Sequence, residues 1–352
     1  MSFIKPKKTS MEIEIFAQCG IIKQILGNYI SNGEININVP DNVNRVILVA
    51  SGSSYHCARY CACLLGSVAN IEARAIYSSE FIIQPKIAEG EDILYIFITQ
   101  SGETTDTNSA LMRAKKHRVK TLCITNNENS SIWNESEYHI ACLAGEEKSI
   151  AATKSLSSQL ICALLLVLKL AQTKNIDVKH LIRDLNDLTD VIEQAYKLHT
   201  KIKQTAKFLS KYKNVVITAD GDMYAFAKEA SLKIKETSYI NTCSYILGEF
   251  MHGHVAVLNN AKSAVIYISN GELNYETVKN LNNIKENYKP PIIIIGNRTN
   301  QIKSTYNLNI DCQKPIIKTF GIIVILQLLA LEIALKLHKN VDKPHGLKKI
   351  VK

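Results

Sequence analysis

The sequence predicts an α/β protein made of two similar halves, each built around a mostly parallel β-sheet. Three observations predict this fold class. Short apolar, β-branched segments alternate with helical segments along most of the chain. Glycine-containing turns after these segments recur at a fixed offset in the second half. The 352 residues are 46% hydrophobic and 21% charged, which is typical of a globular protein large enough for two domains.

The first half contains four segments with the composition of buried strands. They are residues 45–50, 93–99, 119–125 and 138–143. The helical segments that follow or separate them are residues 55–69, 104–117 and about 153–171. Strands that are joined through helices pair in parallel with right-handed crossovers. We therefore expect one parallel sheet in this half.

The second half repeats the pattern, with strands at residues 214–219, 264–269, 291–295 and 308–311 and helices at 224–237 and about 319–336. Gly52 and Gly221 are 169 residues apart, and so are Gly102 and Gly271. Glutamate follows the second glycine of each half. Two turns at one offset predict a duplicated domain.

Helices are also predicted outside the two sheets. Residues 11–26 form one, and residues 178–204 form a single amphipathic linking helix, because apolar side chains recur there every three or four residues. The expected organisation is an N-terminal helical segment (1–33), a first domain (34–173), the linking helix (174–204), a second domain (205–343) and a C-terminal tail (344–352).

Composition narrows the class of partner and the compartment. The net charge is +10, but no dense Lys/Arg block is present, so an anionic small molecule is expected and a nucleic acid is not. The nine cysteines are scattered, and the N-terminus lacks a signal-peptide core, which predicts a cytoplasmic protein with reduced thiols. The longest apolar runs, 160–171 and 321–331, fall short of the ~20 residues of a membrane span and are expected to be buried.

Two turns in the first half are rich in hydroxyl groups. They are residues 51–54 (SGSS) and 99–105 (TQSGETT), each between a strand and a helix. Glycine lets the backbone approach an anion, and free N–H groups at a helix start favour negative charge. The same hydroxyls could instead cap the helices. The matching turns of the second half carry Asp220, Asp222 and Asn270, so that copy is expected not to bind phosphate.

Residues 228–254 contain further candidate groups. Lys233 and Glu236 are three residues apart and therefore share one helix face, which suits either a surface ion pair or an acid/base pair. His252 could act alone as an acid or base. With His254 it makes a weak metal site, because no third ligand at suitable spacing is evident.

The ordered motifs SGSSY, ITQSGETTDT, ATKS, LKIKETSYIN, LGEF and VDKPHGLKKIVK resemble the sugar isomerase (SIS) double-domain family. The resemblance runs from about Met11 to Lys352 and is strongest to the isomerase half of glucosamine-6-phosphate synthase and to stand-alone deaminases. It implies two tandem flavodoxin-like αβα domains. It also implies a sugar-phosphate substrate and no metal or organic cofactor.

The resemblance assigns roles residue by residue. Those for phosphate or sugar binding are Ser54, Thr99, Gln100, Ser101 and Thr104. Glu236 is implied as the proton shuttle beside Lys233, His252 as the ring-opening group and Lys349 as the lysine that closes over the sugar. The histidine is implied to come from a neighbouring subunit, which predicts a homodimer with a shared active site.

Three positions depart from the family pattern. Thr99 and Ala152 stand where serine is usual, and His254 stands where proline is usual. The hydroxyl survives at Thr99, whereas Ala152 at the sugar-binding wall loses one. The last two departures bear on the identity of the substrate more than on the class of reaction.

The expected reaction depends on the start of the chain. Ser2 stands where a glutaminase would carry its cysteine, and the first domain begins within about 40 residues. We therefore expect a glucosamine-6-phosphate deaminase that releases ammonia and fructose 6-phosphate. The alternatives are a fructosamine- or glucoselysine-type 6-phosphate deglycase, the isomerase partner of a separate glutaminase, and a non-catalytic sugar-phosphate regulator.

Overall fold

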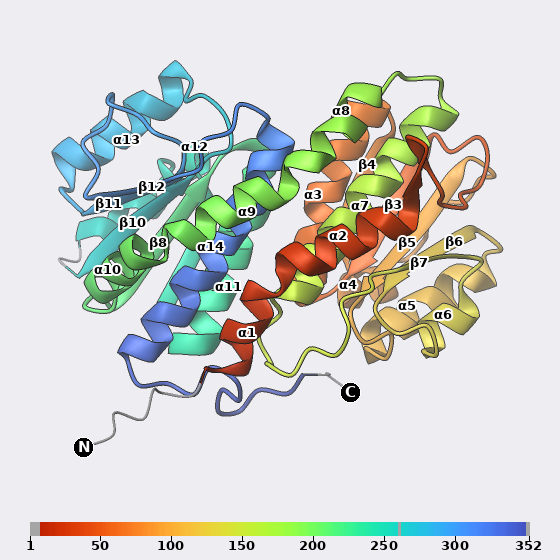
Figure 1. Ribbon diagram of the computed structural model, residues 1–352, viewed down its shortest axis with the longest axis horizontal. Coiled ribbons are helices and arrows are strands. Elements are labelled where there is room, and N and C mark those ends of the chain that lie inside the picture. The colour runs from red at the N-terminus through yellow and green to blue at the C-terminus, as the bar shows by residue number, and fades with distance from the viewer. Residues whose placement is uncertain (1–7, 260–261, 350–352) are drawn as a thin grey trace.

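The computed structural model describes residues 8–259 and 262–349, which form two α/β halves side by side (Figure 1). Each half has a five-stranded sheet in which every neighbouring pair is parallel. The strand orders are β4-β3-β5-β6-β7 and β9-β8-β10-β11-β12. In chain order both sheets read 2-1-3-4-5, which is the flavodoxin-like arrangement. The predicted fold class is confirmed.

The first half contains all the predicted strands and one more. Its strands are β3 (Arg45–Ala50), β4 (Glu72–Tyr77), β5 (Ile93–Thr99), β6 (Lys120–Thr125) and β7 (Tyr138–Ala141). Its helices are α3 (Gly52–Ala69), α4 (Ser78–Ile83), α5 (Thr105–Lys116), α6 (Ser131–Glu135) and α7 (Lys154–Thr173). A short hairpin of β1 (Ile30–Ser31) and β2 (Glu34–Ile35) precedes them.

The second half follows the same plan. Its strands are β8 (Asn214–Ala219), β9 (Asn241–Ile246), β10 (Ser263–Ile268), β11 (Ile292–Gly296) and β12 (Tyr306–Asn309). Its helices are α11 (Tyr224–Ser238), α12 (Leu247–Phe250), α13 (Tyr275–Asn287) and α14 (Pro315–Lys336), with 3-10 turns η2 (Gly221–Met223) and η3 (His254–Asn259).

Strands β4 and β9 are absent from the sequence prediction, and both are edge strands. Their side chains are mostly half-buried or exposed, whereas β5 is buried along its whole length. Neither strand has a continuous buried run, so the hydrophobic pattern misses both, whereas it finds the other two edge strands, β7 and β12.

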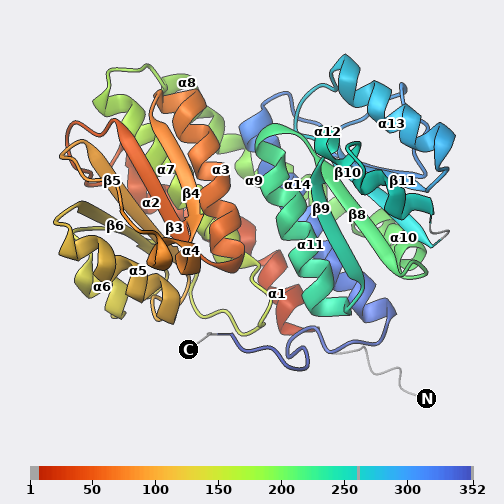
Figure 2. The same cartoon turned by 180° about the vertical axis from the view of Figure 1, so that it is seen from behind.

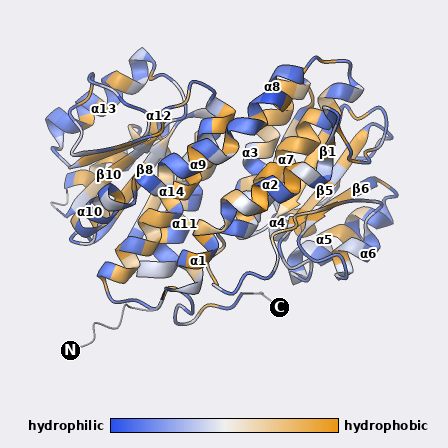
Figure 3. Ribbon diagram, viewed as in Figure 1, coloured by the Kyte–Doolittle hydropathy of each residue, from blue (hydrophilic) through white to orange (hydrophobic). Residues whose placement is uncertain are grey.

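Helices α7 and α14 form the centre of each core (Figure 3). The whole helices, at 20 and 22 residues, are longer than the predicted apolar runs and are long and apolar enough to cross a membrane by length and composition alone. Polar residues at their ends lengthen them beyond the apolar runs. However, 83% and 89% of their most apolar windows are buried inside the protein, as predicted for core helices.

The helices outside the sheets differ from the prediction. The N-terminal segment forms two helices, α1 (Ser10–Phe16) and α2 (Gln18–Tyr29), which pack on α14 and on α7 respectively. The linking segment is not one helix. It comprises α8 (Lys179–Asp184), the 3-10 turn η1 (Leu185–Asp187), α9 (Leu188–Lys197) and α10 (His199–Leu209). The breaks let α9 pack on α2 and α14, and α10 on α14 and β12.

The two ends of the described chain are tied together. The Asp342 carboxylate accepts hydrogen bonds from the backbone N–H groups of Ser10 (2.8 Å) and Met11 (2.9 Å) at the start of α1. Helices α3 and α11 lie between the two sheets and contact each other (Figure 2). The contact between α3 and α11 therefore lies at the boundary between the halves.

Candidate active site

A cleft of about 400 Å³ lies at the carboxyl ends of β3 and β5. The sheet extends from β3 to β4 on one side and to β5 on the other, so the winding of the chain reverses here. Open α/β sheets bind ligands at such a switch point. Within the described chain, the cleft gathers every predicted site residue except His252.

The hydroxyl-rich turns form one wall of the cleft. Ser51 and Thr104 occupy the N-cap positions of α3 and α5, yet neither side chain makes a capping hydrogen bond within the described chain. Thr104 Oγ1 instead lies 3.1 Å from Thr99 Oγ1, and Ser54 Oγ lies 3.1 Å from Gln159 Oε1. Capping therefore does not account for these hydroxyls, and the first N–H groups of both helices remain available to an anion.

Gly102 fixes the shape of the second turn. Its φ of +71° lies in the left-handed region, and a Cβ at this position would overlap the Ser130 side chain. Only glycine meets both conditions. The turn consequently runs close to the segment that precedes α6, with the Ser101 Oγ accepting the Glu103 N–H at 3.1 Å.

Helix α11 supplies Lys233 and Glu236 to the opposite wall, and the buried Glu229 of the same helix contacts Lys233. The Lys233 ammonium contacts the Glu236 carboxylate and lies 3.5 Å from Glu229 Oε1. Glu229 Oε2 lies 2.6 Å from His56 Nδ1, and the Ser53 hydroxyl donates to Glu229 Oε1 at 3.0 Å. Lys233 and Glu229 are buried, whereas Glu236 faces the cleft with 14% of its side chain exposed.

Burial and charge separate the pKa values of the two carboxyl groups. Burial raises the pKa of Glu236 above its ordinary value, although Lys233 offsets part of the rise. Burial also acts to raise the pKa of Glu229, but Lys233, His56 and Ser53 outweigh it, and the net pKa is lowered. Two carboxyl groups with opposite shifts suit separate acid/base and structural roles. Its raised pKa makes Glu236 the better suited of the two to proton transfer.

The third wall joins the loop before α7 to the C-terminal tail. The buried Glu147 carboxylate accepts N–H groups of Thr153 (2.9 Å) and Ser155 (3.0 Å) at the start of α7. Lys349 contacts the same carboxylate and donates to the Ser149 carbonyl at 2.7 Å. Burial acts to raise the pKa of Glu147, but Lys349 and hydrogen bonds outweigh it and lower the pKa. Ala152 also lines this wall, without a hydroxyl.

His252 lies apart from these groups. It follows α12, and its backbone N–H donates to the Glu249 carbonyl at 3.0 Å. Among the described residues, no group of three His, Cys, Asp or Glu is placed to hold a metal ion. The site assembled within one described chain thus consists of the hydroxyl turns, the α11 carboxylates and two lysines.

The matching turns of the second half border a smaller hollow of about 290 Å³. Asp220 Oδ2 accepts hydrogen bonds from the Tyr267 and Thr277 hydroxyls, both at 3.0 Å. The Asn270 amide donates to Thr319 Oγ1 at 3.1 Å. These polar groups are hydrogen-bonded to one another within the second half. A carboxylate at the turn also repels phosphate.

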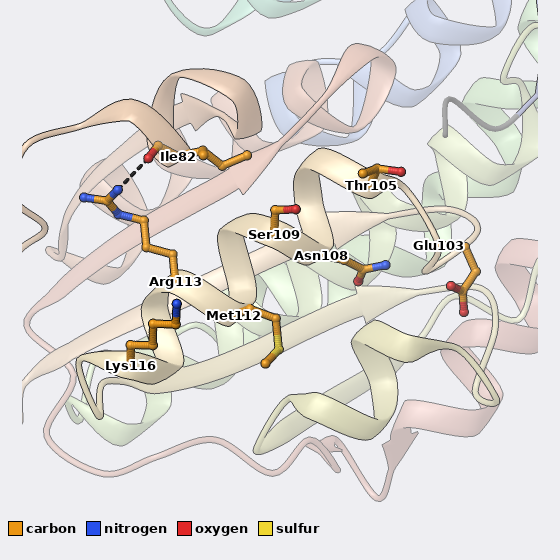
Figure 4. Close-up of a pocket in the computed structure, with 8 residues that line it drawn as sticks. All are labelled: Ile82, Glu103, Thr105, Asn108, Ser109, Met112, Arg113 and Lys116. Carbon is orange, nitrogen blue, oxygen red and sulfur yellow. Dashed lines mark hydrogen bonds between the residues drawn. The ribbon is translucent and has the colours of Figure 1, made fainter.

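A larger hollow of about 710 Å³ lies on the outer face of α5 (Figure 4). Its lining residues are Ile82, Glu103, Thr105, Asn108, Ser109, Met112, Arg113 and Lys116. The Arg113 guanidinium already donates to the carbonyls of Ile82 and Gln84. This hollow gathers none of the predicted catalytic side chains. We therefore identify the cleft of about 400 Å³ at the ends of β3 and β5 as the candidate active site.

Three residues that contact the site escaped the sequence prediction. His56 follows Gly52 by four residues, Glu229 precedes Lys233 by one helical turn, and Glu147 stands before α7. Ser53 lies in a predicted turn, but its contact with Glu229 was not predicted. The pair at i and i+4 on α11 was visible in the sequence. The partners of Glu229 are 173 and 176 residues away, and no local pattern identifies contacts at such separations.

Fold and site together define a double-domain α/β protein whose candidate cleft is lined by the hydroxyl-rich turns of the first half and by α11 of the second. The SIS domain model matches residues 41–169 and 208–337. The chain belongs to the SIS domain family.

Two curated relatives are glutamine–fructose-6-phosphate aminotransferases (isomerizing). The protein of Campylobacter jejuni is 33% identical over 97% of this chain, and that of Escherichia coli is 30% identical over 97%. The chain spans 58% of the length of each.

Solved structures extend the comparison. The C-terminal domain of glucosamine-fructose-6-phosphate aminotransferase from Francisella tularensis has a TM-score of 0.91 at 25% identity, covering 96% of this chain and 99% of that one. A glucosamine-6-phosphate deaminase from Thermotoga maritima has a TM-score of 0.79 at 22% identity, covering 97% and 99%, and shares the fold.

Proposed function

We propose that this chain is an aldose–ketose isomerase that forms glucosamine 6-phosphate, acting as the isomerase half of a glutamine–fructose-6-phosphate aminotransferase. The observation that carries the proposal is the pairing, in one cleft, of an anion-binding turn with Glu236, whose pKa burial raises. The names of the curated relatives and of the Francisella domain support the same direction of reaction. Synthesis of glucosamine 6-phosphate thus takes the place of its deamination as our leading hypothesis.

Phosphate binding is proposed to anchor the substrate on the first domain. Ser54, Thr99, Gln100, Ser101 and Thr104 supply hydroxyl and amide groups, together with the open N–H groups of α3 and α5. Helix dipoles add attraction for the dianion. With the phosphate fixed here, the sugar carbons extend across the cleft toward α11.

Proton transfer is proposed to occur at Glu236. Ammonia condenses with the C2 carbonyl of the open-chain ketose and water leaves, giving an imine. Glu236 then removes a proton from C1 of the protonated imine, which gives a neutral enaminol. It returns this proton to C2 while the C1 hydroxyl loses its own proton to water, and the amino aldose results. The raised pKa brings Glu236 closer to the working pH, where a general base is most effective. Lys233 stabilises the carboxylate when the proton has left.

Lys349 and His252 complete the proposed set. The tail brings Lys349 to the cleft, where its ammonium can contact the sugar after leaving Glu147. We propose that His252 of a second copy opens the sugar ring, which makes the active enzyme a homodimer with shared sites. A cytoplasmic location is part of this proposal, and the nine free cysteines support a reducing compartment.

Deamination is the second candidate, because the same residues catalyse the reverse reaction. Glucosamine 6-phosphate would then yield ammonia and fructose 6-phosphate without a glutamine site. A deglycase acting on fructosamine- or glucoselysine-type 6-phosphates needs a wider pocket. Ala152 on the cleft wall leaves more room for such a substrate than a serine at this position would.

The test compares the purified chain on four mixtures. These are fructose 6-phosphate with ammonium, fructose 6-phosphate with glutamine and a separate glutaminase, glucosamine 6-phosphate, and a fructosamine 6-phosphate. We expect glucosamine 6-phosphate from the first two. Faster ammonia release from the third would favour the deaminase, and amino-acid release from the fourth a deglycase. Tight sugar-phosphate binding with no turnover of any mixture would sink the enzyme proposal and favour a regulator.

A further inference from the structure

The Glu229 carboxylate connects the two halves of the protein. It belongs to α11, and its two oxygens meet donors from the first half: the Ser53 hydroxyl at 3.0 Å and the His56 ring nitrogen Nδ1 at 2.6 Å. His56 has 6% of its surface exposed and Glu229 has 2%. A buried carboxylate is costly unless such donors satisfy it.

The same contacts form a chain from the phosphate-binding turn to the proposed base. Ser53 precedes Ser54 in the first turn, and Glu229 lies one helical turn before Lys233. The Lys233 ammonium sits between two carboxylates, 3.5 Å from Glu229 and in closer contact with Glu236. The position of this one buried cation therefore depends on how strongly each carboxylate attracts it.

We infer that His56 is a positioning residue that satisfies Glu229 from the phosphate-binding domain and thereby leaves Lys233 in place beside Glu236. The inference rests on the proposed function for its kinetic consequences. His56 donates into the Glu229 carboxylate and reduces the pull of that carboxylate on Lys233. Without the histidine, Glu229 attracts the ammonium more strongly, and the Lys233–Glu236 contact weakens.

This mechanism differs from a purely structural role. If His56 only stabilised the fold, its loss would lower the melting temperature and leave turnover per folded molecule unchanged. If it positions Lys233, its loss lowers kcat with little change in KM for the phosphorylated substrate. Removal of the Glu229 charge as well then restores part of kcat, because nothing competes with Glu236 for Lys233.

His199 provides a matched control. Its Nε2 lies 2.6 Å from Glu332 Oε1, in a partly buried histidine–glutamate pair between α10 and α14. Neither residue lines the cleft in the described chain. His199→Ala removes the same kind of bond at the same distance, away from Lys233.

The experiment measures kcat, KM and melting temperature for His56→Ala, His56→Asn, His56→Ala/Glu229→Gln and His199→Ala. We expect kcat of His56→Ala to fall about tenfold or more, as for a lost hydrogen bond to a charged group. The Asn side chain can donate from nearly the same place as Nδ1, so His56→Asn should recover most of this loss. The double variant should exceed His56→Ala, and His199→Ala should match the wild type in kcat.

Equal kcat for His56→Ala and wild type would overturn the inference, and so would a double variant slower than His56→Ala. A separate readout covers the case in which the wild type turns over no sugar phosphate. The ¹⁵N resonances of the His56 ring, assigned by comparison with His56→Asn, should shift in Glu229→Gln and on titration with inorganic phosphate, whereas His199 should not. Insensitivity of His56 to both changes would refute the link between the turn and Glu229, whatever the reaction.

Discussion

Replacing Gly102 by alanine tests whether the shape of the second turn determines phosphate binding. Gly102 has a φ of +71°, and its missing side chain leaves room for Ser130. Gly221 offers a matched control in the second half. Its φ is +57°, and no described atom lies within 4 Å of a Cβ built there. The two substitutions share the backbone strain and differ in the overlap.

The expected loss of stability has two parts. An alanine in the left-handed region costs about 1–2 kcal/mol. Overlap of the new methyl group with Ser130 adds about 1–3 kcal/mol, as for overpacking in a core. We therefore expect Gly102→Ala to lower the free energy of unfolding by about 2–5 kcal/mol and Gly221→Ala by about 1–2 kcal/mol.

Urea unfolding measures both losses, and titration with fructose 6-phosphate measures binding. Gly102→Ala should weaken binding, since the turn must move, whereas Gly221→Ala should not. Adding Ser130→Gly to Gly102→Ala should recover the overlap part, with a coupling energy of about 1–3 kcal/mol in the double-mutant cycle. Equal losses for the two alanine variants, or no recovery with Ser130→Gly, would refute the argument.

Three further predictions concern the charged walls. Glu236→Gln should lower kcat by about 10²–10⁴-fold while sugar-phosphate affinity is retained, which turnover and calorimetry can check. Because the pKa of Glu236 is raised, the wild-type kcat should still increase with pH above the pH range in which an ordinary glutamate ionises. The same ionisation should lower the free energy of unfolding as the pH rises, since the folded protein holds this proton more tightly than the unfolded chain. Glu236→Gln should show neither pH dependence. Glu147→Gln should lower the free energy of unfolding by about 3 kcal/mol at pH 7 and by less at pH 4. The pKa of Glu147 is lowered in the folded protein, so the stability that its carboxylate contributes is lost on acidification. Melting curves at both pH values measure the difference.

The sequence predicts the repeated sheet and the hydroxyl-rich turns that line the cleft because both depend on local patterns. Apolar runs mark the buried strands, and the offset of 169 residues aligns Gly52 with Gly221, which share a φ of +57°. The edge strands β4 and β9 have no such run. The linking segment keeps its helical period across its breaks, so periodicity alone could not reveal the bends.

The polar partners in the site could not be predicted, because they meet only when the halves pack. Glu147 accepts a hydrogen bond from the backbone of Thr153, six residues later, at the start of α7. Its ionic partner, Lys349, is 202 residues away. His56 looks like an ordinary core histidine in its sequence context. Its role depends on Glu229, which arrives from the other half.

The duplication explains why the chain has one such site. Helices α3 and α11 are equivalent, but α3 carries Tyr60, Leu64 and Ser67 at the positions where α11 carries Glu229, Lys233 and Glu236. Tyr60 is buried against Phe226, so α3 offers no carboxylate to the hollow of the second half. Conversely, Asp220 replaces Ser51 at the turn that would hold phosphate there.

Each half has therefore kept a different part of the machinery. The first half carries the hydroxyl-rich turns, and the second carries the carboxylates and the lysine on α11. Only the cleft that combines the turns of the first half with α11 of the second contains both parts. The reciprocal combination has an acidic turn and a buried tyrosine, and so lacks the hydroxyls and the carboxylate of the proposed mechanism. A duplicated fold with complementary losses thus makes the contact between α3 and α11 essential to the site, which is where His56 and Glu229 meet.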